Sequence, residues 1–172
     1  MSNMPDLWAA RAVAASSVSP QKLHGVPVGL MFFEGAPRLV RSGVTIPALQ
    51  SGDPERIVVE AYPGVLARRL IGRASYKKDK LRKQTEKQRL ARGVMLDHIL
   101  SGQIEASYGL RVQAPKNLAD DPSGDQLDAL LCAIQAAWAW TMRDYGYGAS
   151  FDADSLEGRI ADPSLRRTAL SS

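Results

Sequence analysis

The residues with the clearest capacity for chemistry are three carboxylates at the ends of two expected elements. Glu60 ends a segment expected to be a strand, and Asp125 and Asp128 open a segment expected to be a helix. Carboxylates that converge from a strand end and a helix start can hold Mg²⁺, which prefers hard oxygen ligands. A pair of such ions can activate water for phosphodiester cleavage. The alternative is that the two aspartates only cap the helix and complement its dipole, and spacing alone favours this alternative.

Basic residues are concentrated between positions 68 and 92. This segment holds eleven of the 22 Lys and Arg residues and only two acids, a net charge of +9 in a chain whose total is +4. Such a concentration is what binding to a phosphate backbone requires. A solvated helix face is the other interpretation. The residues that we expect to contact nucleic acid are Arg68, Arg69, Lys77, Lys78, Arg82 and Lys83.

Other reactive residue types indicate no site. The histidines His24 and His98 are isolated, and the single cysteine, Cys132, cannot form an internal disulfide or a cysteine-cluster zinc site. Cys132 fits a core position better than a nucleophile, because no histidine constellation accompanies it. Neither a glycine-rich dinucleotide fingerprint nor a P-loop is present, so those nucleotide-binding enzymes have no support.

Several elements must position these side chains. The β-branched segment 56–62 predicts a strand, and a helix is expected to begin at 65–71. A helix-forming stretch runs from Lys77 to Arg92 and is expected to resume over 94–100. At 124–143 the apolar stripe has helical spacing, and alanines cover much of the remaining surface, so we expect a helix buried on more than one side.

Two regions are less distinctive. Residues 3–15 predict a short helix, and the apolar run 28–33 fits either a buried strand or a short helix, because periodicity alone does not separate them. A further short element is expected at 38–46. No secretory signal is recognisable, and the longest apolar stretch is far shorter than the roughly 20 residues of a membrane span. We therefore expect a soluble, cytoplasmic protein without membrane contact.

Two stretches together resemble a known family. They are VVEAYPGVLARRLIGRASYKKD (58–79) and DDPSGDQLDALLCAIQAAWA (120–139), and the family is domain-of-unknown-function family 429, described as predicted RNase-H-like nucleases. The motifs that carry the resemblance are Glu60-Ala61-Tyr62-Pro63, Tyr76-Lys77 and Asp125-x-x-Asp128-Ala129. VGLMFFEGAPRL (28–39) looks like the family's linker into the strand. The resemblance covers about residues 28–140 and matches only the C-terminal part of the family domain.

The resemblance implies an α/β, RNase-H-like fold, with Asp125 and Asp128 as ligands of Mg²⁺ or Mn²⁺ and Glu60 as a further catalytic carboxylate. The family's usual first strand with Gly-x-Asp, and its later Asp before a Pro-Phe-Gly-like turn, have no counterpart in this sequence. We therefore expect an N-terminally shortened domain with more helix than strand. It would comprise an N-terminal helix and connection (1–27), the remnant domain (28–145) and a polar tail (146–172).

The function implied is that of a metal-dependent nuclease, inactive if the missing acidic strands leave its site incomplete. Two other interpretations stay open. One is a non-catalytic module that binds nucleic acid or another polyanion. The other is a subunit that associates with itself, or with a missing N-terminal fragment, because an uncovered strand edge or apolar face invites association.

Overall fold

The computed structural model describes residues 28–78, 84–148 and 159–165. In chain order the elements are α2 (Val28–Arg41), β1 (Val44–Thr45), β2 (Asp53–Ile57), α3 (Pro63–Ile71), α4 (Glu86–Leu100), α5 (Glu105–Tyr108), η2 (Lys116–Asp120), α6 (Asp125–Thr141), η3 (Arg143–Gly148) and η4 (Pro163–Leu165). This part of the chain is mostly helical with one small parallel sheet, which is compatible with the α/β class. The helix expected at 3–15 lies outside the described residues.

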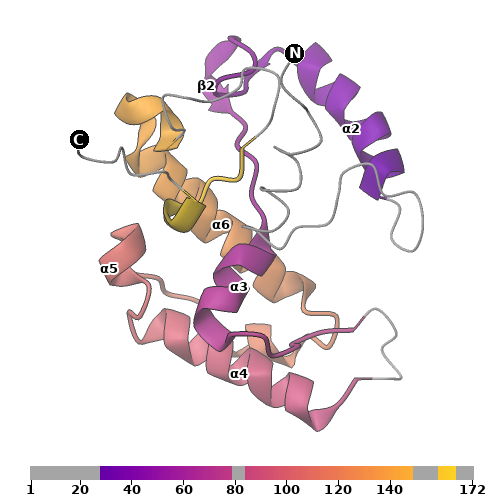
Figure 1. The fold of residues 1–172 in the computed structure, drawn as a ribbon, viewed down its shortest axis with the longest axis vertical. Coiled ribbons are helices and arrows are strands. Elements are labelled where there is room, and N and C mark those ends of the chain that lie inside the picture. The colour runs from indigo at the N-terminus through magenta and orange to yellow at the C-terminus, as the bar shows by residue number, and fades with distance from the viewer. Residues whose placement is uncertain (1–27, 79–83, 149–158, 166–172) are drawn as a thin grey trace, which may run out of the picture.

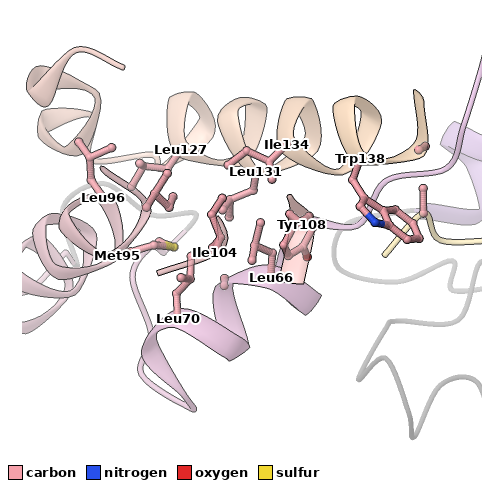
Figure 2. Packing of buried hydrophobic residues seen from close by; sticks show 14 residues of the cluster. Leu66, Leu70, Met95, Leu96, Ile104, Tyr108, Leu127, Leu131, Ile134 and Trp138 are labelled. Atoms are coloured by element: carbon pink, nitrogen blue, oxygen red, sulfur yellow. The ribbon is translucent and has the colours of Figure 1, made fainter. Parts of the chain in front are cut away.

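The core lies between α3, α4 and α6, with α5 closing one side (Figure 1). Figure 2 shows Leu66 and Leu70 of α3 directed toward Leu131 of α6, with Met95 of α4 beside them. Leu66, Met95 and Leu131 are fully buried. Burial of apolar side chains from three separate helices makes this cluster the main source of stability in the described fold.

The helix α6 confirms one part of its prediction and corrects another. The apolar stripe is buried, at Leu127, Leu131, Ile134 and Trp138. Of the alanines only Ala139 is buried, whereas those at 129, 133, 136 and 137 are exposed. The expectation of burial on more than one side is therefore wrong, because these four alanines, which were expected to pack against neighbouring backbone, are exposed.

The helix α4 begins later than its sequence predicts. Helix-forming residues start at Lys77, yet the helix starts at Glu86. Thr85 and Gln88 form a capping box, in which the Gln88 backbone N–H donates to Thr85 Oγ1 at 3.3 Å and the Thr85 N–H donates to Gln88 Oε1 at 3.0 Å. This box satisfies N–H groups at the helix start and fixes the boundary there. From Glu86 the helix runs without interruption through 94–100.

The strand predicted at 56–62 is displaced. The observed β2 covers Asp53–Ile57, and its parallel pairing with β1 ends where Thr45 lies opposite Ile57. β1 has only two residues, and the last backbone bond to it in the described structure is the one that the Val58 N–H donates to the Thr45 carbonyl at 2.9 Å. Further along, Glu60 forms a parallel bridge with Ile160, and the Ala161 N–H donates to the Glu60 carbonyl at 2.7 Å.

The ambiguous run 28–33 is helical and forms the first part of α2. The helix continues through Pro37 to Arg41, so the separate element expected at 38–46 is wrong; its last residues form β1 instead. Figure 1 shows α2 set apart from the α3, α4 and α6 cluster. Its large apolar side chains remain exposed as a result. No helix within the described ranges is both long and apolar enough to cross a bilayer.

Candidate functional site

The start of α6 carries a compact polar cluster built on two aspartates. The Tyr76 hydroxyl donates to Asp128 Oδ1 at 2.6 Å, and the Lys77 ammonium group forms an ion pair with Asp128 Oδ2. The same ammonium lies 3.8 Å from Asp125 Oδ1. The Asp128 side chain is 21% exposed, whereas that of Asp125 is 78% exposed. Lys77, which was expected to contact nucleic acid, is therefore the cation that the two aspartates share.

Glycine at position 124 lets the Tyr76–Lys77 segment lie over the start of α6. Gly124 has a positive φ of 74°, and a Cβ atom there would lie 3.1 Å from Cβ of Lys77 and 3.4 Å from Cε2 of Tyr76. A side chain at this position would be strained and would push the segment away. The close approach therefore depends on glycine preceding Asp125.

Two buried polar residues of α4 hold the same segment from the other side. Gln88 Nε2 donates to the Lys77 carbonyl and to Ser75 Oγ, both at 3.0 Å. Arg92 Nη1 donates to the Tyr76 carbonyl at 2.9 Å. Because these bonds fix the backbone, the Tyr76 and Lys77 side chains are directed to α6 by the fold.

The electrostatics of the cluster oppose ionisation of its weak acids. Burial, followed by the hydrogen bond to Asp128, raises the pKa of Tyr76 above its ordinary range. Burial and the Asp128 charge also raise the pKa of the Cys132 thiol, one helical turn further along. Cys132 is therefore held as a thiol, consistent with its interpretation as a packing residue.

The three acids expected to form one site do not meet. The chain just after Glu60 lies beside the middle of α6, where the Tyr62 N–H donates to Gln135 Oε1 at 2.9 Å. Gln135 is seven residues beyond Asp128, which corresponds to about 10 Å along the helix. Within the described ranges, no group of three or more His, Cys, Asp or Glu residues could hold a metal ion.

The arrangement of the aspartates does not fit the expected Mg²⁺ or Mn²⁺ ion. One oxygen of Asp128 accepts from Tyr76, and the other is paired with Lys77. Such ions need several oxygen ligands close to 2 Å. The second aspartate, Asp125, faces the same ammonium group. The cationic partner of this acidic pair is therefore supplied by the chain itself.

The other residues expected to contact nucleic acid have different environments. Arg68 and Arg69 are exposed in the last turn of α3, where the Arg69 guanidinium also lies 5.8 Å from the centroid of the Tyr108 ring. Lys78 is exposed in the connection to α4. The remaining two expected residues, Arg82 and Lys83, lie outside the described residues.

Arg92 is a structural residue that the charge count placed among the solvated cations. It is 3% exposed, and besides the Tyr76 carbonyl it donates to the Ala119 carbonyl at 2.9 Å and to Gln84 Oε1 at 3.0 Å. The position of Arg92 in the helical repeat of α4 could have indicated this burial. Arg92 lies three residues before the buried Met95 and four after the buried Gln88, on the face that α4 turns to the core.

One comparison with known proteins identifies a relationship. A family model described as protein of unknown function, DUF429, matches residues 6–151. The match is wider than the expected range 28–140 and covers most of the chain. The expectation that the resemblance is limited to a C-terminal part is therefore wrong. No curated protein and no solved structure matches the chain.

Proposed function

This chain belongs to the DUF429 family of proteins of unknown function, and we propose that it is a non-catalytic, nucleic-acid-binding relative of the RNase-H-like nucleases. The observation that carries the proposal is a set of exposed cations along the connection from α3 to α4. Two arrangements in the fold support it: the two aspartates of the expected catalytic site share the Lys77 ammonium group, and the connection is held in place by Gln88 and Arg92.

We call these exposed cations the connection strip, and its members are Arg68, Arg69, Arg73, Lys78 and Lys87. Arg68 and Arg69 lie in the last turn of α3, Arg73 and Lys78 in the chain that follows it, and Lys87 in the first turn of α4. Gln84 Nε2 donates to the Lys78 carbonyl at 3.1 Å, which keeps the end of the connection close to the start of α4. Exposed cations close together in the chain suit a phosphate backbone, because each neutralised phosphate releases counterions.

Fluorescence anisotropy with labelled single- and double-stranded DNA and RNA tests the proposal. The variant Arg73→Ala/Lys78→Ala/Lys87→Ala removes three charges from the strip. We expect it to bind at least about tenfold more weakly, with a salt slope smaller by roughly two to three units, because three phosphate contacts are lost. The matched control, Arg41→Ala/Arg111→Ala/Arg143→Ala, removes three exposed charges elsewhere. Equal losses in both variants would show that binding depends only on net charge.

The same samples separate the proposal from the nuclease interpretation. Labelled substrates incubated with Mg²⁺ or Mn²⁺ are expected to remain intact on denaturing gels, because Lys77 occupies the acidic pair. Metal-dependent cleavage that disappears in Asp128→Asn would overturn the non-catalytic proposal and favour the nuclease. Binding without cleavage that weakens steeply with salt supports it.

A second candidate role, self-association, rests on the exposed apolar face of α2. Six large apolar side chains of this one helix are between 42% and 72% exposed: Leu30, Met31, Phe32, Phe33, Leu39 and Val40. Contiguous apolar surface of this kind marks an interaction site more often than a free surface. At about 100° per residue, Phe32, Phe33, Leu39 and Val40 share the side of α2 opposite Glu34 and Arg38. These four side chains could supply part of the roughly 800 Å² per partner that a stable dimer buries. We propose that a second copy of the chain covers this face.

Light scattering after size-exclusion chromatography tests the dimer. We expect the unmodified protein to be dimeric at micromolar concentration and Phe33→Glu to be monomeric. Leu90→Glu is the matched control, because Leu90 is also exposed, at 54%, but lies on α4. A monomeric unmodified protein would exclude this role without affecting the proposal for the connection strip.

A further inference from the structure

We infer that Lys77 is the resident counter-ion of the acidic pair Asp125 and Asp128, and that its ammonium group excludes divalent cations from this pair. The inference concerns how the protein compensates two carboxylates at the start of α6. It does not depend on nucleic-acid binding, because it follows from the ion pairs and the backbone clamp alone.

The first support is that the backbone that carries the Lys77 side chain is held by two hydrogen bonds. Its carbonyl accepts from the buried Gln88, and the preceding carbonyl, that of Tyr76, accepts from the buried Arg92. The Lys77 side chain is only 34% exposed. A surface lysine loses rotamer entropy when it forms an ion pair, and this loss makes most such pairs weak. Here the fold has already ordered the backbone that carries the side chain.

The second support is that both oxygens of Asp128 are used. Oδ1 accepts from the Tyr76 hydroxyl at 2.6 Å, and Oδ2 is in contact with the Lys77 ammonium. A divalent ion would have to bind these same oxygens at close to 2 Å. It would then lie beside a positive charge that cannot withdraw without breaking the ion pair. Coulomb repulsion and steric overlap therefore both disfavour the metal.

The third support is the charge that would remain without Lys77. Asp125 and Asp128 are three residues apart on α6 and therefore lie on one face. The partial positive charge of the helix start compensates them only in part. Replacing Lys77 by a neutral side chain of similar length would leave two carboxylates facing an open position. Such a pair should then attract the divalent cations that the native protein excludes.

Manganese binding to the full chain tests the inference. Free Mn²⁺ is measured by its electron paramagnetic resonance signal during titration of the unmodified protein, of Lys77→Met and of Lys77→Gln. We expect both variants to bind Mn²⁺ at least about tenfold more tightly than the unmodified protein, since two carboxylates become available as oxygen ligands. Lys116→Met is the matched control, because Lys116 is an exposed lysine of η2 outside the connection strip. It should behave like the unmodified protein.

The possible outcomes are separable. Manganese binding by the unmodified protein that is lost in Asp128→Asn would overturn the inference, and this measurement requires no lysine variant to fold. Failure of both folded Lys77 variants to gain Mn²⁺ affinity would also overturn it. Metal binding and nucleic-acid anisotropy are separate measurements. Failure of the counter-ion inference would remove the reason for calling the protein non-catalytic, but it would leave nucleic-acid binding by the connection strip to be judged by its own test.

Discussion

Gln135 and Asp162 are joined inside the protein, where Gln135 Nε2 donates to Asp162 Oδ2 at 2.8 Å. The same carboxylate accepts from the Tyr108 hydroxyl, and its other oxygen accepts from the backbone N–H and the hydroxyl of Ser164. Gln135 is fully buried and Asp162 is 2% exposed. A buried carboxylate is tolerated when each oxygen is hydrogen-bonded. The chain at 159–165 is therefore attached to the core rather than lying on its surface.

Asp162→Ala should destabilise the protein strongly. The substitution leaves the Tyr108 hydroxyl and the Gln135 amide buried without their acceptor, so the free energy of unfolding should fall by about 2–4 kcal/mol. Urea denaturation followed by circular dichroism measures the change. Asp120→Ala, an exposed acid in η2, is the matched control and should change stability by less than about 0.5 kcal/mol. Similar values for the two variants would contradict a structural role for Asp162.

Alkaline pH should destabilise the fold through two buried tyrosines. Burial and hydrogen bonds to aspartates raise the pKa of Tyr76 and of Tyr108 above the ordinary value of 10.0. Both groups are protonated in the folded and the unfolded chain below pH 10, so their contribution to stability is complete there. Above pH 10 the unfolded chain loses these protons first, so this contribution is lost progressively as the pH rises.

Urea unfolding between pH 8 and pH 11 measures this dependence, and Tyr108→Phe provides the comparison. The variant should be less stable than the unmodified protein at pH 8, because the buried Asp162 loses a donor. Its stability should then fall less steeply above pH 10, since one ionising group has been removed. The matched control is Tyr145→Phe, at a side chain that is 60% exposed. Parallel slopes for Tyr108→Phe and the unmodified protein would contradict the linkage.

The sequence predicts the elements better than it predicts the site. The stripe that includes Leu127 and Leu131 identifies α6, because its periodicity is a local property of consecutive residues. The pairing of Lys77 with Asp128 joins residues 51 positions apart. That pairing depends on how α3, α4 and α6 pack, and the spacing of residues along the chain does not predict it. Glu60 was expected to join Asp125 and Asp128 in one site because it was expected to end a strand, whereas β2 ends three residues earlier.

Gln88→Ala should destabilise α4 and loosen the connection at the same time. The substitution removes one side of the capping box with Thr85 and the bonds to Ser75 and to the Lys77 carbonyl. Loss of a cap costs about 1 kcal/mol, and unsatisfied partners add a similar amount. Lys87→Ala, one residue earlier and exposed, should be within about 0.5 kcal/mol of the unmodified protein. Hydrogen exchange should increase at residues 75–77 in the first variant only.

Two glycines of η3 differ in what a methyl group would meet, and this difference allows a sharp comparison. Gly146 and Gly148 both have positive φ values, 63° and 77°. A Cβ atom on Gly146 would meet nothing within 4 Å, whereas one on Gly148 would lie 2.5 Å from Cη2 of Trp138. Trp138 is 5% exposed and packs edge-on against Tyr108, so its ring has little room to move.

Gly146→Ala should therefore cost only the strain of the left-handed backbone, about 1–2 kcal/mol. Gly148→Ala should lower the free energy of unfolding by that strain and by about a further 1–3 kcal/mol, because the added methyl group would overpack the site and displace Trp138. Urea denaturation gives the two free energies of unfolding, and the near-ultraviolet circular dichroism of the tryptophans should change only in Gly148→Ala. Equal destabilisation with unchanged spectra would mean that η3 does not press against Trp138, and the packing of this end of α6 would need to be revised.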